Sequence, residues 1–398
     1  MRNIIFVLLL LLSAANAVAA VWRVEKDGTG DFTIIQQAVD ASASGDTILI
    51  GPGRYDDKFL WGNPPWQQYT RVLVTRADLT LIGAGADQTI IGSAVPLGIG
   101  YSQDSGLAAH VALGGGALRV SLIGFENCYR GAYFVGLESA IVVDCRFAGS
   151  GNSVASTNVD DLIVESCNFE SVTSVDSFAS HLAVWGPGRF TLLRSSLAIS
   201  KLHNYAWSHV RLQQISAARI VSCQFEGGAI GLNMSGGSGT GDLIDCRFVD
   251  QHNAGIAHAV AHGTIRVANT TMQRQYKALW SAEVNPRWEV DGLIVEDAFE
   301  YSLVFSYLGD GYIRNSQLAR GMRYVVRDAG VASSDVVVHF DMTNNWWGTT
   351  EPDSIQSWIF DGNDQPERPY YFIDWMPFRS GPVGTEERSF GGVKSMFR

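Results

Sequence analysis

A short strand-like pattern recurs along the chain and constrains its fold more than any other feature. The copies IVVDCRF, LIVESCNF, RIVSCQF and DLIDCRF end at Phe147, Phe169, Phe225 and Phe248. Weaker copies end at Phe125, Leu197, Met272, Phe299, Leu318 and Trp347. From Phe147 onward the successive spacings are 22, 28, 28, 23, 24, 27, 19 and 29 residues. Quasi-periods of this length indicate a solenoid whose loops vary in length while its strands stay in register.

Within a copy, the Cys and the final large residue are two positions apart, so on a strand they point to the same side. One such unit cannot bury its apolar face alone, whereas units stacked about 4.8 Å apart share a continuous core. A β-sandwich or a propeller is the alternative, but propeller blades of about 40 to 45 residues fit these spacings poorly. The pattern therefore predicts an all-β chain, a parallel β-helix of about ten coils.

The cysteines also follow the repeat. Four of the five, Cys145, Cys167, Cys223 and Cys246, occupy its inward position, and the fifth is Cys128. This placement favours a stacked ladder of buried thiols over a disulfide framework, and an odd count leaves at least one thiol free. No CxxC pair occurs, so we expect no metal site of that kind.

The first residues are typical of a signal peptide, for which we predict the boundaries 1–19. Arg2 supplies a positive start, Ile4 to Leu12 is an unbroken apolar stretch, and small residues follow. The apolar run is too short to span a membrane, and no second long run follows it. We therefore expect a secreted protein (periplasmic, extracellular or cell-surface) with no integral membrane segment.

A short helix is predicted ahead of the repeats. Thr33 and Gln36 have capping-box spacing, an apolar stripe accompanies them, and the helix is expected to end near Gly45. The stripe consists of Ile34, Ile35, Ala38 and Val39. We expect this helix to cover the first coil. Without a cover, the apolar core and the strand edge of that coil would be exposed to association with other protein molecules.

Charge narrows the range of partners. The chain has 29 Lys and Arg against 40 Asp and Glu, a formal net charge of -11. Nucleic acid is not expected as a partner, because phosphate binding needs a basic footprint. Acidity also counts against a bare polyuronate, so neutral glycans fit better on this criterion. We expect the protein to be a monomer.

Two stretches resemble a known superfamily. Val24 to Asp57, with Leu79 to Ser93 after it, resembles the opening of pectin methylesterases and of secreted bacterial right-handed parallel β-helix proteins of the pectate-lyase-like superfamily. Asn344 to Asp364 is similar to the closing segment of the bacterial members. The resemblance implies a right-handed β-helix. We predict one domain over 20–378, with a cap at 20–57, a closing segment at 344–378 and a tail at 379–398.

The resemblance implies no particular activity. The chain has no QDTL-like, GTVDFIFG-like or GRPW-like segment, so pectin methylesterase activity is not expected. If the chain is an enzyme, it resembles polysaccharide lyases or glycoside hydrolases. We expect no cofactor, with calcium as an open alternative at the acidic turns Asp27–Asp31 and Asp361–Asp364; an Asx turn explains both more simply.

Aromatic and polar residues gather in three long coils, of 28, 28 and 27 residues. Trp or Tyr next to Arg, His or Lys is the composition expected where aromatic faces pack on sugar rings. We predict a polysaccharide-binding groove on one lateral side of the helix, and structural packing of the same residues is the alternative. The candidate residues are Trp185, Tyr205, Trp207, His209, Trp280 and Arg287.

Histidines offer a weaker signal. His181 and His209 are 28 residues apart and can stack on successive coils, either as acid–base groups of a groove or as surface residues that share a phase by chance. His258 and His262 form an HxxxH without an evident third metal ligand. Two functions therefore stay open: a secreted protein that binds or processes a polysaccharide, and a non-catalytic structural or adhesion protein.

Overall fold

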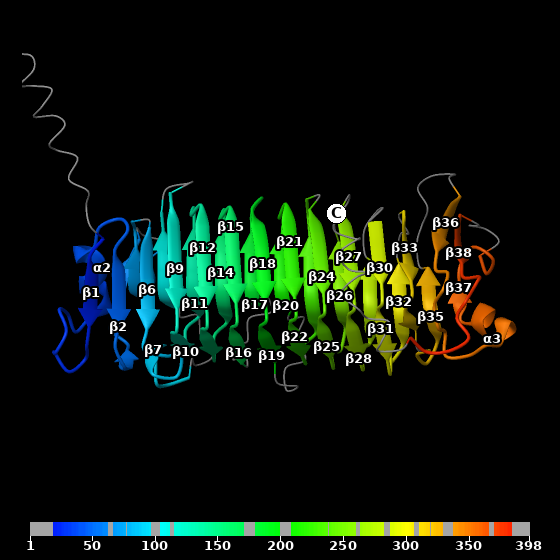
Figure 1. Ribbon diagram of the computed structural model, residues 1–398, viewed down its shortest axis with the longest axis horizontal. Helices are drawn as coiled ribbons and strands as arrows, with labels where there is room; N and C mark the ends of the chain where they lie inside the picture. Colours follow the sequence, from blue (N-terminus) through cyan, green and yellow to red (C-terminus); the bar gives the residue numbers. More distant parts are fainter. Residues whose placement is uncertain are drawn as a thin grey trace, which may run out of the picture.

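The computed structural model is a long rod of stacked coils, with α2 (Ile35–Ala41) at one end and α3 (Pro352–Ser357) at the other (Figure 1). The structure describes residues 19–62, 67–76, 78–96, 104–111, 115–170, 180–199, 208–237, 239–259, 263–281, 287–305, 310–318, 320–328, 337–365 and 370–383. Residues 1–18 of the predicted signal peptide and 384–398 of the predicted tail lie outside these residues. No helix in the described part of the chain combines the length and the apolar character needed to cross a membrane.

The strands form three long sheets, here named A, B and C. Within the described residues, sheet A has 14 strands, sheet B has 11 and sheet C has 13. Sheet A contains β1 (Val21–Val24), β2 (Thr47–Ile50), β6 (Leu79–Gly83), β9 (Ala117–Ser121), β12 (Ser139–Val143), β15 (Asp161–Glu165), β18 (Arg189–Leu193), β21 (Ala217–Val221), β24 (Thr240–Ile244), β27 (Thr264–Ala268), β30 (Arg287–Asp291), β33 (Gly311–Arg314), β36 (Val338–Asp341) and β38 (Tyr371–Asp374).

Sheet B contains β3 (Gly53–Tyr55), β7 (Thr89–Gly92), β10 (Gly124–Glu126), β13 (Arg146–Ala148), β16 (Asn168–Glu170), β19 (Ser196–Ala198), β22 (Gln224–Glu226), β25 (Arg247–Val249), β28 (Thr271–Gln273), β31 (Ile294–Glu296) and β34 (Gln317–Leu318). Sheet C contains β4 (Phe59–Trp61), β5 (Gln68–Val74), β8 (Asp104–His110), β11 (Arg130–Val135), β14 (Asn152–Thr157), β17 (Ser180–Trp185), β20 (Ser208–Gln213), β23 (Ile230–Ser235), β26 (Ala254–Ala259), β29 (Lys277–Ser281), β32 (Tyr301–Phe305), β35 (Tyr324–Asp328) and β37 (Ile359–Phe360). Neighbouring strands come from successive coils and run parallel, except for the antiparallel pair β4 and β5. The prediction of an all-β parallel β-helix is confirmed.

A single left-handed residue turns the chain from sheet A to sheet B on successive coils. Its φ lies between 45° and 72°, a region that disfavours most side chains but is tolerated by Asn and Asp. Short polar residues are accordingly frequent at this corner, which includes Leu122, Asp144, Ser166, Arg194, Ser222, Asp245, Asn269, Gly292, Asn315 and Asn344. One residue per corner keeps sheets A and B in constant phase, which explains why the motif persists while the period varies.

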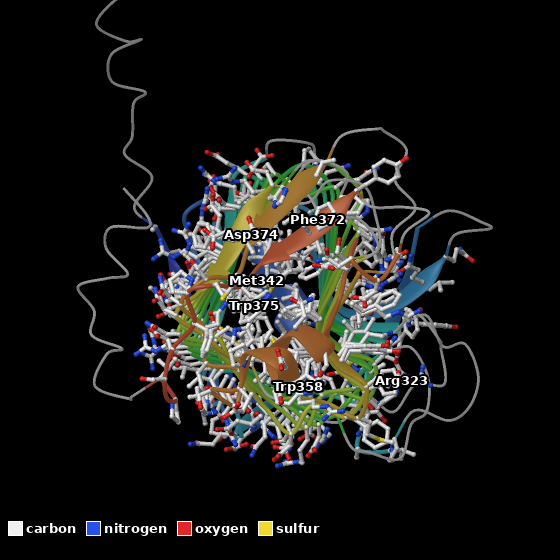
Figure 2. All side chains as sticks on the ribbon, turned by 90° about the vertical axis from the view of Figure 1, so that its right-hand side faces the viewer. Arg323, Met342, Trp358, Phe372, Asp374 and Trp375 are labelled. Carbon is white, nitrogen blue, oxygen red and sulfur yellow. The ribbon has the colours of Figure 1, made fainter. Side chains whose placement is uncertain are left out.

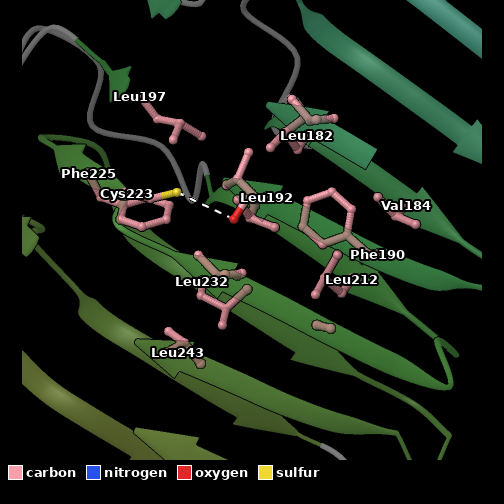
Figure 3. Close-up of a cluster of buried hydrophobic side chains, with 14 of the residues drawn as sticks. Leu182, Val184, Phe190, Leu192, Leu197, Leu212, Cys223, Phe225, Leu232 and Leu243 are labelled. Atoms are coloured by element: carbon pink, nitrogen blue, oxygen red, sulfur yellow. Dashed lines mark hydrogen bonds between the residues drawn. The ribbon is translucent and has the colours of Figure 1, made fainter. Parts of the chain in front are cut away.

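The inward Phe ladder and the free thiols are both confirmed. Ring centroids of Phe125 and Phe147 lie 5.0 Å apart at 8°, and those of Phe225 and Phe248 lie 4.3 Å apart at 3°. All five cysteines are buried and free. In the core around Phe225, the thiol of Cys223 points at the carbonyl oxygen of Leu192, 3.6 Å away (Figure 3). Stacked rings add about 0.5 to 1.5 kcal/mol per pair beyond their burial.

One repeat end differs from the prediction, because Val295 and not Phe299 ends the copy between Met272 and Leu318. Met272 pairs with Val295, and Val295 with Leu318, so both spacings are 23 residues rather than 27 and 19. Phe299 is 60% exposed and stacks on Tyr276 outside the core. The reason is local: Gly292 forms the corner, which places the apolar run after it on sheet B. The coil that carries Trp280 is therefore not a long one.

Glycines on sheet C leave space for the rings of the Phe ladder. A Cβ at Gly131 would lie 2.7 Å from Phe147, and one at Gly231 would lie 2.4 Å from Phe248. In the register of the coils, His181 and His209 take the position of these glycines beside the part of the ladder where Leu197 replaces Phe. The histidines thus complete a core that elsewhere is filled by rings from sheet B.

Ion pairs cross between coils on the outer faces of sheets A and B. Arg146 on sheet B bonds Glu126 at 2.9 Å and Glu170 at 3.0 Å, one on each neighbouring strand. Arg266 on sheet A does the same with Asp242 at 3.3 Å and Glu289 at 2.8 Å. Arg146 and Arg266 are thus each paired within the chain, and each links three coils.

The helix α2 covers the start of the rod, but the predicted capping box does not form. The helix begins after Ile34, which makes no side-chain cap, and ends at Ala41. The Gln36 side chain instead pairs with the strand edge of β5, accepting from the Leu73 amide at 2.7 Å and donating to the Leu73 carbonyl at 3.1 Å. The glutamine thus serves the sheet edge rather than its own helix.

The far end of the rod is closed by large side chains. Figure 2 looks along the rod at this end and shows Met342, Trp358 and Trp375 between the sheets. Met342 is fully buried, and the Trp375 indole donates to Gln356 in α3 at 3.1 Å. The last coil therefore has an apolar lid, as the first one does.

Candidate ligand-binding face on sheet C

The outer face of sheet C presents a column of side chains that the register defines. Leu279, Leu303 and Val326 point into the core and are fully buried. The residues that follow them, Trp280, Val304 and Arg327, are paired in register and lie on the opposite side of the strands. The outer face of the C-terminal half of sheet C is thus partly aromatic and partly cationic.

Three successive coils bring a cluster of polar and aromatic groups together where their sheet C strands begin. Tyr276, Glu300 and Arg323 stand directly before β29, β32 and β35, and each strand starts with a long side chain. These first residues are Lys277, Tyr301 and Tyr324, which are paired in register. We call Tyr276, Lys277, Trp280, Glu300, Tyr301, Arg323 and Arg327 the sheet C cluster.

The geometry of the cluster is tight. The Lys277 amine lies 4.7 Å from the centre of the Trp280 ring and 5.3 Å from that of Tyr276. Two guanidinium groups donate to the hydroxyl oxygen of Tyr301, that of Arg327 at 3.0 Å and that of Arg323 at 3.4 Å. Aromatic faces hold the lysine as cation–π partners.

Its electrostatics differ from those of the other faces. Burial lowers the pKa of Lys277, and the charge of Arg327 adds to this, while the Glu300 carboxylate opposes both. Arg323 forms an ion pair with Glu300 at 3.3 Å, and the hydrogen bond between Tyr276 and Glu300 raises the pKa of Tyr276. Among the described residues no carboxylate lies within ion-pair distance of Lys277 or Arg327.

The arrangement suits an anionic ligand group. Two cationic side chains without a carboxylate partner in the described part of the chain can share the oxygens of a carboxylate or sulfate. The Trp280 ring offers an apolar face beside them, which suits the face of a sugar ring. An amine with a lowered pKa can also take up a proton from a bound ligand.

Trp185 and Trp280, two of the predicted site residues, lie on this outer face. Trp280 is half-buried and packs on an outer apolar group that contains Ile230 and Ala257. Trp185 ends β17, is half-buried, and donates from its indole to the Gln213 side chain at 2.6 Å. Four strand spacings separate β17 from β29, roughly 19 Å along the rod.

His209 occupies a different place from the one predicted. It is fully buried, and its ring stacks on His181 with centroids 5.4 Å apart. The predicted stacking on successive coils is correct, but both rings point inward, so neither the groove nor the surface interpretation holds. Burial lowers the pKa of His209 to about 4. A side chain with no exposed surface cannot contact a ligand.

Arg287 also departs from the expected position. It begins β30 on sheet A and bonds Glu289 at 2.7 Å as well as Asp310. The predicted shared lateral side therefore does not extend to it, because its coil had already turned from sheet C to sheet A. Tyr205 and Trp207 lie outside the described residues.

No metal centre emerges in the described part of the chain, where no three His, Cys, Asp or Glu side chains come together. His258 is fully buried beside Trp288, with ring centroids 5.7 Å apart. His262, the other half of the HxxxH, lies outside the described residues. A shallow cavity at the far end of the rod is lined by Asp341 and Asp374, which pair with Arg314 and His339.

Sequence reasoning missed most of the sheet C cluster. Lys277 is only three residues from Trp280 in the sequence, but Tyr301 and Arg327 are separated from it by one and two coils. Counting 24 residues from Trp280 to Val304 and 23 more to Arg327 places all three in one column. The misplaced repeat at Phe299 hid this register.

No protein-family model matches the chain, and no curated protein matches its sequence. Solved structures do match. The catalytic domain of a GH87 α-1,3-glucanase in complex with nigerose shares 11% identity at a TM-score of 0.42, over 82% of this chain and 63% of that one. Pectin methylesterase from carrot shares 13% at 0.30, over 91% and 89%.

A third match is a tailspike protein from the Acinetobacter baumannii bacteriophage Fri1, a capsular polysaccharide depolymerase, with 12% identity and a TM-score of 0.33 over 94% and 66% of the two chains. The chain spans less than two thirds of the length of the glucanase catalytic domain described first. At these identities and TM-scores, neither activity nor substrate is transferred, and the fold rests on the strand pairing described above.

Proposed function

We propose that the protein binds a polysaccharide carrying acidic groups on the outer face of sheet C. The observation that carries the proposal is the sheet C cluster, where Lys277 and Arg327 lie beside Trp280 and pair with no described carboxylate. Arg146 and Arg266 are paired with carboxylates of neighbouring coils, whereas cations without such a partner suit a ligand that supplies the negative charge.

The overall acidity of the chain does not oppose this ligand. The net charge is -11, but the field felt by a ligand near contact is set by groups within about 8 to 10 Å at physiological ionic strength. Within the sheet C cluster, the three cations Lys277, Arg323 and Arg327 outnumber the one carboxylate, Glu300. The local balance therefore replaces the earlier preference for neutral glycans, which rested on net charge alone.

The face is also long enough for a chain ligand. Trp185 and Trp280 bracket three strands, and the first two of these carry the half-buried side chains of Arg211, Gln213 and Asn233. Amide and guanidinium groups between two aromatic rings suit the hydroxyls of consecutive sugars. We propose contacts at Trp185 and Trp280 and an anion contact at Lys277 and Arg327.

A binding screen tests the proposal. The protein is titrated with uronate-containing, sulfated and neutral polysaccharides, each with and without calcium, and binding is followed by calorimetry. Binding of an acidic polysaccharide that weakens at least tenfold in Lys277→Ala, with an unchanged melting temperature, is the expected result. Binding that is unchanged in that variant, or binding of neutral polysaccharides alone, would overturn it.

The same samples address catalysis and the second candidate function. Polysaccharide lyase or hydrolase activity releases shorter products, whereas a structural or adhesion protein leaves the polymer intact. Secretion, which the predicted signal peptide over 1–19 supports, is part of the proposal and is checked by locating the mature chain outside the cytoplasm of the producing cell.

A further inference from the structure

The outer edge of the first strand of sheet A is covered by an acidic turn. In β1, the backbone of Arg23 faces away from β2 and toward the end of the rod. Its amide donates to the Asp31 carboxylate at 2.9 Å, and its carbonyl accepts from the Phe32 amide at 3.1 Å. The turn between Asp27 and Phe32 thus takes the place that a further strand would occupy.

The outer edge of the last strand of sheet A is covered in the same way. In β38, the amide of Ile373 donates to the Asp361 carboxylate at 3.0 Å, and the carbonyl of Tyr371 accepts from the Gly362 amide at 2.6 Å. Asp361 is only 1% exposed, so this carboxylate is committed to the edge.

These are the two acidic turns Asp27–Asp31 and Asp361–Asp364, and both are Asx turns. Asp27 accepts from the Thr29 amide at 3.0 Å, and Asp361 accepts from the Asn363 amide at 2.9 Å. At each end a second set of contacts goes to the sheet edge. An Asx turn forms without any contact to a strand edge, so the bonds to β1 and β38 are additional to those that form the turns.

The two edges are complementary to each other. All neighbouring strands of sheet A run parallel, so β1 of one molecule can continue the sheet after β38 of another by translation along the rod. Such a contact is head-to-tail and does not close, so it produces filaments. Exposed strand edges are the common route to this kind of association.

We propose that the two ends of sheet A form a latent head-to-tail interface for a second copy of this chain, and that the two turns anchored by Asp31 and Asp361 keep it closed. A contact needs one open β1 edge and one open β38 edge. Opening only one end of every molecule leaves no complementary edge, whereas opening both permits a chain of molecules.

Mixing single variants tests this directly. Asp31→Ala and Asp361→Ala are each measured alone and then mixed in equal amounts by analytical ultracentrifugation, and the double variant is measured separately. Each single variant is expected to stay monomeric, the mixture to approach twice the monomer mass, and the double variant to form longer assemblies. Asp353→Ala, which removes an exposed carboxylate from α3, serves as the charge control.

Folding is kept separate from association. Circular dichroism and the melting temperature are recorded for every variant, and Asp31→Asn with Asp361→Asn retains an acceptor oxygen and is expected to stay monomeric. A natively folded double variant that remains monomeric would overturn the proposal. So would single variants that associate alone as strongly as the mixture, because the contact would then not be head-to-tail.

Discussion

The outer faces of sheets A and B differ from the outer face of sheet C in what their charges do. On sheets A and B, Arg146 and Arg266 each bridge carboxylates on both neighbouring coils. On sheet C, Lys277 rests on aromatic rings and Arg327 on a tyrosine hydroxyl. Cationic side chains therefore link neighbouring coils on sheets A and B, whereas on sheet C they remain available to a ligand.

The largest loss of stability is expected from a substitution in the core. Phe225→Ala removes a ring that stacks on Phe248 at 4.3 Å and is 1% exposed. We expect unfolding to become easier by about 3 to 5 kcal/mol, because a cavity remains between coils. Urea unfolding measures the loss, and Phe299→Ala, on the exposed ring, is the matched control. A neutral result at Phe225 would contradict the inward ladder.

The inner side of sheet C is expected to be sensitive to acid. Burial lowers the pKa of His209 to about 4, whereas the unfolded chain binds a proton near pH 6.5. The unfolded state thus binds more protons between these values, so the free energy of unfolding falls as the pH drops through this window. The loss attributable to His209 is roughly 3 kcal/mol.

The measurement compares urea unfolding of the wild type and His209→Leu from pH 7 to pH 4. The variant lacks the titrating group, so its profile should be shallower across the window. Parallel profiles would show that the ring is not held neutral in the folded state.

Some features of this fold can be predicted from the sequence, and others cannot. The alternation in the Cys-x-Phe copies is local, so the inward ladder and the free thiols follow from the sequence. The side on which a residue lies depends on where each coil turns its corners, and that required Gly292 and the other left-handed positions. Misplacing one repeat at Phe299 was enough to assign Arg287 to the same side as Trp280 and to conceal Arg327.

The predicted aromatic contacts sharpen the comparison between faces. Trp280→Ala is expected to weaken polysaccharide binding by about 1 to 3 kcal/mol, because its half-buried ring packs on the outside of sheet C. Calorimetric titration gives the binding change, and the melting temperature should move little. Trp288→Ala, which removes a fully buried ring, is the contrasting variant and should mainly lower stability. If Trp280→Ala unfolds as readily, its role is packing.

The smallest effect is expected from a single ion pair. Arg266→Gln removes contacts to Asp242 and Glu289 that are partly open to solvent. Surface pairs of this kind contribute about 0.2 to 1 kcal/mol each, so the free energy of unfolding should change by no more than about that amount per pair. Denaturant titration at low and high salt checks it; a loss that does not shrink in salt would argue against an electrostatic origin.

One paired measurement tests the central claim that charges on sheet C serve a ligand. Arg327→Gln and Arg266→Gln remove the same guanidinium group from two different faces, and the affinity of each variant for the acidic polysaccharide that the wild type binds is measured by calorimetry. The account predicts at least a tenfold loss for Arg327→Gln, about 1.4 kcal/mol or more, and an unchanged affinity for Arg266→Gln. Equal losses in the two variants, or no loss in Arg327→Gln, would contradict it.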